Sequence, residues 1–478
     1  MLALRLPIAF FHRTRIMYKL SDYLIFTPAV ANKQSDDALH IMYATRSGNS
    51  LLLKKSVCDN LKKGAFDKLG DETLAKLIQI DAIVPQEENE FETVLEENLA
   101  IIAGYRRLTI VIQPTANCQL GCNYCGQKHS KVNASQEISN KIVARIKEKL
   151  STGAFKSLKL QWYGGEPLMA YSEILRISQE VREYCAEHNI KYGSHMITNG
   201  LSFKPAVFLN LLQQQVSHFQ ITLDGGQETH DVMRITKEGK KTFNIILDNV
   251  IDVTNLPEYI ASDVSIAIRI NINQTTVRGI YKLIDLLAQH RLYEKKVFLD
   301  FACVVDWGDN DASKGSLSRE EYAKQEIDWY MYANEKGFRF GGMIPERNYA
   351  PCMVVDPNAE VYDAFGNIYP CYEFPYTPKY EGADYKLGHL DANPPIQNPN
   401  AITRNWNSDV KTDISPCKKC PLFPVCGGGC PKQWYSGSIA CPSFKLNITD
   451  RLALDYLNKR EAAKKASAKV ETLAPEIA

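Results

Sequence analysis

From residue 108 onward, short apolar runs alternate with amphipathic segments along the chain. Apolar runs bounded by polar turns are typical of buried parallel strands, and apolar residues repeating every three or four positions are typical of helices. The pattern predicts six strands, at 108–113, 158–163, 193–198, 218–223, 264–272 and 297–304. It predicts helices at 135–150, 171–188, 205–214, 242–253, 276–289 and 319–335. This alternation indicates an α/β fold with a parallel sheet, whose sites form at the C-terminal ends of the strands.

The regions on either side of this alternation have other patterns. Residues 17–100 place β-rich runs before two helical patterns, which predicts a small α+β domain, and their acidic stretch at 86–98 is expected to be a solvated linker helix. Cys-, Gly- and Pro-rich hairpins follow residue 342. The predicted domains are therefore 17–100, 106–341 and 342–450, and 451–478 is expected to be a helix with a fraying, disordered tail. The first 16 residues carry their charges after the apolar run and favour a start at Met17 over a targeting signal.

Composition narrows the class of protein. The chain has 478 residues, of which 45% are hydrophobic and 23% are charged, and its formal net charge is +1. This balance is typical of a globular protein. The net charge is too close to zero for nucleic acid to be the main partner. No apolar stretch reaches the ~18 residues that a membrane span needs. The 13 cysteines stand out. Because their number is odd and a cytoplasmic location is expected, they favour metal ligation over disulfides.

A C-x3-C-x2-C array, Cys118, Cys122 and Cys125, follows the first predicted strand. Three thiolates on one loop can bind three irons of a four-iron cluster and leave the fourth iron open to another ligand. The alternative is a structural zinc site, for which His129 is the nearest fourth ligand. Polar turns follow the next strands, at Gly164-Gly165-Glu166-Pro167, Thr198-Asn199-Gly200 and Thr222-Leu223-Asp224-Gly225.

This array, together with the turns, resembles the radical S-adenosylmethionine (radical SAM) superfamily. In that family the open iron binds S-adenosylmethionine, whose one-electron cleavage gives a 5′-deoxyadenosyl radical that removes a substrate hydrogen. The resemblance implies a partial (β/α)6 barrel in which Cys118, Cys122 and Cys125 bind the catalytic cluster. It also implies a set of residues that bind S-adenosylmethionine: Tyr124, Gly164, Gly165, Glu166, Pro167, Asn199, Thr222, Arg234 and Arg269.

Seven further cysteines lie in the region 342–450: Cys352, Cys371, Cys417, Cys420, Cys426, Cys430 and Cys441. A zinc ribbon is one explanation of the C-x2-C-x5-C-x3-C block among them. The whole pattern is similar to the SPASM domain, which carries auxiliary clusters in radical SAM enzymes that modify peptides. The resemblance implies one [4Fe–4S] cluster on Cys417, Cys420, Cys426 and Cys441, and another on Cys352, Cys371 and Cys430 without a fourth cysteine. The remaining Cys58, Cys185 and Cys303 are expected to be buried apolar residues.

The same resemblance implies a polypeptide substrate. We expect a peptide maturase that installs carbon–carbon, ether or thioether cross-links in a ribosomally synthesised precursor, most similar to the darobactin-like group. In their order of strands then helices, residues 17–100 resemble the winged-helix-type recognition domains joined to peptide maturases. Such a domain would bind the precursor's leader by adding it as a strand to a sheet, or would only cap the barrel. The alternatives are a peptide epimerase, a metal-holding scaffold and an anaerobic sulfatase-maturing enzyme, although that last family has Asp after the second SPASM cysteine, where Tyr372-Glu373 follows Cys371 here. A flavodoxin- or ferredoxin-type protein is the expected electron donor.

Overall fold

The computed structural model describes residues 17–31, 38–306, 308, 310–340 and 342–471. The expectation about the first 16 residues, like the last part of the expected tail, concerns residues outside these ranges. Within the described residues, no helix combines the length and the apolarity needed to cross a membrane.

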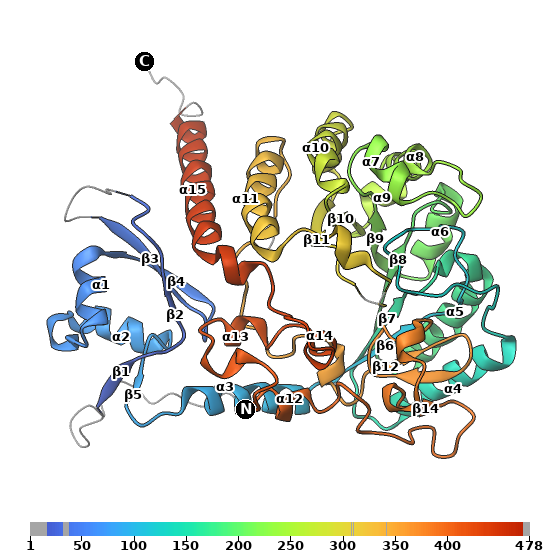
Figure 1. Cartoon of the computed structure of the whole chain (residues 1–478), viewed down its shortest axis with the longest axis horizontal. Helices are drawn as coiled ribbons and strands as arrows, with labels where there is room; N and C mark the ends of the chain where they lie inside the picture. The colour runs from blue at the N-terminus through green and yellow to red at the C-terminus, as the bar shows by residue number, and fades with distance from the viewer. Residues whose placement is uncertain (1–16, 32–37, 307, 309, 341, 472–478) are drawn as a thin grey trace.

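Six parallel strands form one sheet, in which they neighbour one another in chain order (Figure 1). They are β6 (Arg107–Ile112), β7 (Ser157–Trp162), β8 (Lys191–Thr198), β9 (Val216–Thr222), β10 (Ser265–Ile272) and β11 (Val297–Cys303). The main helices that alternate with them or follow them are α4 (Gln136–Ser151), α5 (Tyr171–Glu187), α6 (Pro205–Gln213), α8 (Phe243–Thr254), α10 (Ile280–Gln289) and α11 (Arg319–Glu335). The predicted α/β fold with six parallel strands is confirmed.

The strands bury every second residue against these helices. Leu158, Leu160 and Trp162 of β7, for example, belong to the large apolar core. Successive side chains of a strand point to opposite faces of the sheet. Lys159 and Gln161 therefore lie on the other face, which is the inner face of the curved sheet.

The sheet continues beyond the six strands into the C-terminal region. β12 (Glu360–Tyr362) pairs in parallel with β6, and β13 (Asn367–Tyr369) and β14 (Gly388–His389) follow it. Glu360 is buried and accepts hydrogen bonds from Arg145 and Lys149 of α4 at 2.9 and 2.6 Å. The predicted boundary at 342 thus separates two stretches that share one sheet.

The N-terminal residues form strands before helices, as predicted. β2 (Leu24–Phe26), β3 (Leu39–Ala44) and β4 (Asn49–Lys54) make an antiparallel sheet, followed by α1 (Lys55–Lys62) and α2 (Asp71–Gln79). β1 (Tyr18–Leu20) pairs with β5 (Ile83–Pro85). Strand β3 packs its Ile41 and Tyr43 against Leu422 and Val425 of the cysteine-rich region.

Helix α3 (Glu90–Ala103) corrects the expectation of a solvated linker. Its Phe91, Val94 and Leu95 are buried, and the Phe91 ring lies 5.1 Å from the ring of Phe423. These apolar residues are spaced three or four apart and form one helix face. The expectation was wrong because the acidic composition hid this amphipathic pattern.

The C-terminal helix α15 (Phe444–Glu471) begins earlier than the predicted residue 451 and lies beside α11 (Figure 1). Arg451 is buried there and its Nη2 donates to Glu326 Oε2 at 2.6 Å. The helix also continues past residue 460, and the fraying expected there stays a prediction. The ion pair anchors its first turns to the barrel.

Candidate active site

A cavity of about 290 Å³ lies at the C-terminal ends of the parallel strands. Its wall brings together ten residues predicted for the site: Cys118, Cys122, Cys125, Tyr124, Gly164, Gly165, Asn199, Thr222, Arg234 and Arg269. Glu166 and Pro167 are not in this wall. The polar turns that follow separate strands in the sequence therefore meet at one place.

The three cysteines lie on the loop between β6 and α4. Backbone hydrogen bonds hold this loop, from Gly121 N to Ile235 O at 2.9 Å and from Ala116 N to Val132 O at 2.9 Å. Burial raises the pKa of Cys118 to about 11 and that of Cys122 to about 12. Such thiols stay protonated near neutral pH unless a cation stabilises the thiolate, as bound iron does. Cys118 is buried, and Cys122 and Cys125 are partly buried. Three such thiols beside a polar cavity fit a cluster with one open iron.

The Gly-Gly-Glu-Pro turn after β7 contributes both a tight backbone conformation and a buried carboxylate. A Cβ on Gly164, whose φ is +81°, would lie 2.0 Å from Gln113 Oε1, so only glycine fits there. The carboxylate of Glu166 is fully buried and accepts hydrogen bonds from Thr198 Oγ1 at 2.7 Å and from Asn199 N at 2.7 Å. In this structure Glu166 holds two turns together. The direct cofactor contacts assigned to Glu166 and to Pro167 stay predictions.

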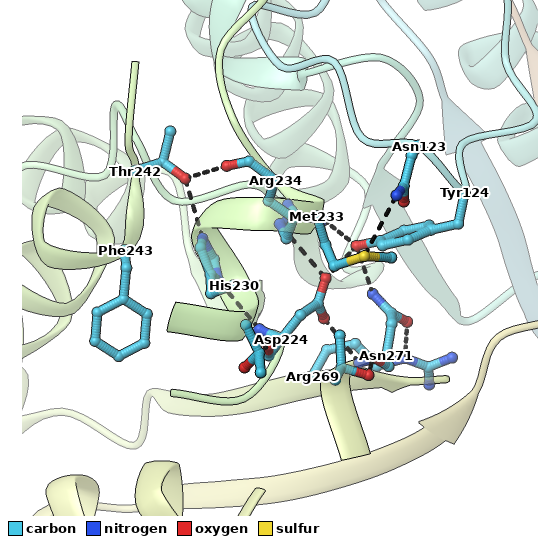
Figure 2. A network of polar contacts seen from close by, with 12 residues as sticks. Asn123, Tyr124, Asp224, His230, Met233, Arg234, Thr242, Phe243, Arg269 and Asn271 are labelled. Atoms are coloured by element: carbon cyan, nitrogen blue, oxygen red, sulfur yellow. Dashed lines mark hydrogen bonds and ion pairs between the residues drawn. The ribbon is translucent and has the colours of Figure 1, made fainter. Parts of the chain in front are cut away.

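Tyr124 is fixed by a buried polar network (Figure 2). Its hydroxyl donates to Asp224 and accepts from Arg234 Nη1 at 2.6 Å and from Asn271 Nδ2 at 3.1 Å. Burial raises the pKa of Asp224, although Arg234 opposes this shift. The network holds the ring at the cavity wall with an orientation set by three other elements.

His230 supports this network from behind (Figure 2). Its Nδ1 accepts from Asp224 N at 3.1 Å, and its Nε2 lies 3.0 Å from the hydroxyl of Thr242, which donates to Arg234 O. Burial lowers the pKa of His230 to about 2, so the imidazole is neutral at pH 7. A neutral ring can accept at one nitrogen and donate at the other, as this chain of bonds requires.

The cysteine-rich region closes the cavity from the other side. Tyr372, Glu373 and Thr377 line it. Tyr163 of the barrel packs edge-on against Tyr372, with ring centroids 5.3 Å apart, and its hydroxyl donates to Glu373 Oε1 at 3.1 Å. Gln113 Nε2 donates to Tyr372 O at 2.5 Å. The wall is therefore built jointly by the barrel and the C-terminal region.

Sequence reasoning missed part of this wall. Gln220 carries a signal, because it shares the inner face of β9 with the predicted site residue Thr222. Tyr163 carries a weaker one, because it directly precedes the predicted Gly-Gly-Glu-Pro turn. Glu373 and Gln127 lie on loops and carry none. Cys303, expected to be a buried apolar residue, is partly exposed and lines the cavity, which corrects that expectation.

The seven C-terminal cysteines fall into two groups. Cys417, Cys420, Cys426 and Cys441 line one small apolar cavity. In the other group burial raises the pKa of Cys371, and the neighbouring Cys352 and Cys430 raise it further. These are the groups that the sequence predicted, and cluster binding by them stays a prediction. Among the described residues, no three His, Cys, Asp or Glu side chains are placed to hold a single metal ion.

Residues 112–256 match the sequence profile of the radical SAM superfamily. The chain contains a radical SAM domain. It is similar to a cysteine-type anaerobic sulfatase-maturating enzyme of Clostridium novyi (strain NT), with 23% identity over 71% of this chain and 94% of the relative. It is also similar to the radical SAM cyclopropyl synthase TigE of Paramaledivibacter caminithermalis, with 22% identity over 77% of this chain and 79% of that protein.

The fold agrees with this assignment. A solved structure described as native anSMEcpe with bound AdoMet and Cp18Cys peptide has a TM-score of 0.55 at 20% identity, covering 74% of this chain and 98% of the other. Radical SAM domains bind S-adenosylmethionine and a [4Fe–4S] cluster, and the cavity that contains Cys118, Cys122 and Cys125 fits both.

Proposed function

We propose that this protein is a radical SAM peptide maturase that cross-links side chains in a ribosomally synthesised precursor peptide. One observation carries the proposal: the cavity beside Cys118, Cys122 and Cys125 is closed by Tyr372 and Glu373 of a second cysteine-rich region. A site built by both regions suits a substrate that must reach the radical domain and the C-terminal cysteines together. TigE, named as a cyclopropyl synthase, supports the same direction.

When bound, the cluster and S-adenosylmethionine supply a carbon radical that removes a substrate hydrogen. The chain's own residues hold the reactants in place. Cys118, Cys122 and Cys125 bind the catalytic cluster, and Tyr124, Asn199, Thr222 and Arg234, with the backbone of Gly164 and Gly165, form the wall for the cofactor. Arg269 lies nearer solvent, where its Nη1 contacts Asp300 Oδ2 at 2.8 Å. Tyr372 and Glu373 face the substrate and exclude water.

The two C-terminal cysteine groups would each hold an auxiliary [4Fe–4S] cluster. Four thiols line the outer site, whereas the inner group offers three. The inner group lies next to Glu373, since the Glu373 carboxylate also raises the pKa of Cys371. We therefore assign three clusters to the chain, which predicts about twelve irons after anaerobic reconstitution.

The N-terminal residues 17–100 would bind the leader of the precursor. Strand β4 lies at the edge of its sheet beside α1, and Leu52 on it is 43% exposed. An extended peptide can pair with such an edge. Leu52→Glu should weaken binding of the leader without changing cleavage of S-adenosylmethionine, and Leu99→Glu on α3, where the side chain is 41% exposed, is the matched control. If calorimetry gave equal leader affinity for both variants, residues 17–100 would be assigned only the role of capping the barrel.

The bond type is tested by co-expressing the enzyme with each short peptide encoded beside its gene. Mass spectrometry should show a loss of about 2 Da per carbon–carbon link in one of these peptides, without use of a cysteine. We favour a carbon–carbon or ether link over a thioether. An unchanged mass with a deuterium label at one α carbon would show epimerisation and reject cross-linking.

Sulfatase maturation is the second candidate, because relatives with that name align over most of this chain. The residues after Cys371 argue against it, since Tyr372 and Glu373 stand where that family has an Asp directly after the cysteine. Incubating the reconstituted enzyme with peptides that carry a Cys- or Ser-type sulfatase site decides between the candidates. We expect no formylglycine, and its formation would replace our proposal.

A further inference from the structure

A group of basic side chains lies on the inner face of the barrel, deeper than the cavity. It consists of Lys159 on β7, His195 on β8 and His218 on β9, and we name it the basic lumen cluster. Residues two apart on a strand share a face and are separated by about 7 Å. Tyr163, Ile197 and Gln220 on the same three faces line the cavity. The cluster therefore lies about 7–13 Å below the cavity wall, toward the N-terminal ends of the strands.

The members of this cluster are close together and partly open to solvent. The rings of His195 and His218 have centroids 5.4 Å apart, and His218 Nδ1 lies 2.8 Å from Ser265 Oγ. Burial lowers the pKa of His195 to about 4, and Lys159 lowers it further. Burial also lowers the pKa of His218 below its ordinary value. A neutral imidazole can donate one hydrogen bond. The ammonium of Lys159 supplies the positive charge.

This charge has no partner within the described part of the chain. Lys159 Nζ forms no hydrogen bond or ion pair there, and burial, followed by Arg107, lowers its pKa. Asp300 faces His218 but is bound by Arg269 at 2.8 Å. A half-buried ammonium whose acceptors are only water is less well solvated than an exposed one. The arrangement is one that an anionic ligand would complete.

We propose that the basic lumen cluster binds a carboxylate of the substrate, either a peptide C-terminus or an acidic side chain. The assignment to a peptide rests on the proposed function. An extended chain covers about 3.5 Å per residue, so this carboxylate would lie two to four residues from the residue that reacts in the cavity. The cluster would thus select which position of the peptide is modified.

The test uses full-length, cluster-loaded enzyme with ¹³C-labelled histidine. N-acetyl-triglycine, with a free carboxylate, is titrated against its C-terminal amide while NMR follows the ring signals of His195 and His218, assigned through His195→Gln and His218→Gln. We expect the acid to shift both signals and the amide to bind at least about tenfold more weakly, because it lacks a charge-assisted hydrogen bond. Lys159→Met should weaken binding of the acid by about tenfold.

Lys156→Met is the matched control, since Lys156 is exposed just before β7 and should leave binding unchanged. Lys159→Gln replaces the methionine variant if that variant does not fold, as judged by thermal unfolding. N-acetyl-Gly-Glu-Gly-amide against its Gln analogue separates a side-chain carboxylate from a C-terminus, and binding of either source supports the proposal. Equal binding of acid and amide, or unchanged acid affinity without Lys159, would overturn it. Acetate binding as tightly as the tripeptide acid would overturn the peptide assignment alone, independently of any mass change in a precursor.

Discussion

The first cysteine loop and the C-terminal cysteine region hold their thiols by different means. Cys118, Cys122 and Cys125 follow β6, and the sheet behind them has a continuous apolar core. The C-terminal cysteines lie on loops and short helices such as α13 (Phe423–Cys426) and α14 (Pro431–Tyr435), around three consecutive glycines with positive φ. A sheet keeps its shape without metal, whereas a segment with little regular structure gains stability from its ligands. We therefore expect the metal to be needed for the reaction in the first cysteine loop, and for both the reaction and folding in the C-terminal region.

Replacing Cys118, Cys122 and Cys125 together by Ala gives the largest expected effect on activity. Reductive cleavage of S-adenosylmethionine should disappear, and bound iron should fall by about four atoms per chain. The thermal unfolding temperature should stay close to that of the parent, because the core under the loop is unchanged. Cleavage that survives in this variant would end the assignment of the catalytic cluster.

Replacing Cys417 and Cys420 by Ala should affect folding and leave cleavage of S-adenosylmethionine intact, the opposite of the triple variant. Iron should again fall by about four atoms, while cleavage of S-adenosylmethionine without substrate persists. Amide exchange should rise across 416–442 and also in β3, because Thr45, which directly follows β3, donates from its Oγ1 to Pro421 O at 2.6 Å. Cys58→Ala, which changes a buried cysteine outside both groups, is the control. Unchanged exchange would mean that the region folds without its cluster.

Glu360→Gln tests the link between the two regions. Burial alone would raise the pKa of Glu360, but Lys149 and Arg145 outweigh burial and lower it. A lowered folded-state pKa gives stability that is present above the unfolded pKa of about 4.3 and is lost as pH falls through the folded value. We expect the variant to lose about 3 kcal/mol of unfolding free energy at pH 7. Urea titrations should show this difference shrinking below about pH 4, and a difference independent of pH would contradict the ion-pair account.

Tyr124→Phe should have the smallest effect. The change removes the hydroxyl that joins Asp224, Arg234 and Asn271 but keeps the ring and the cysteine loop. We expect the affinity for S-adenosylmethionine to fall about tenfold with iron content unchanged, because buried polar groups lose a partner. Equilibrium binding measures this directly. A loss of iron would show that the network positions the cluster instead.

The barrel was predictable from sequence because its strands are nearly continuous apolar runs between polar turns. The two cysteine arrays were predictable because their spacing is improbable by chance. The amphipathic face of α3 was hidden by acidic residues, and the pairing of β12 with β6 depends on partners far apart in the chain. The side chains of Glu166 and Glu373 show what the sequence could not predict, which is the direction in which a side chain points. Whether a carboxylate turns inward to bind backbone amides or outward to a cavity depends on tertiary contacts that no local pattern records.

The central claim is that the cavity between the two cysteine regions generates a radical on a peptide. It is tested most directly by incubating the reconstituted enzyme and S-adenosylmethionine with a uniformly deuterated precursor peptide. The account predicts that 5′-deoxyadenosine acquires deuterium from the peptide, and that the triple variant of Cys118, Cys122 and Cys125 forms none. Formation of 5′-deoxyadenosine without deuterium, while the peptide is modified, would contradict it.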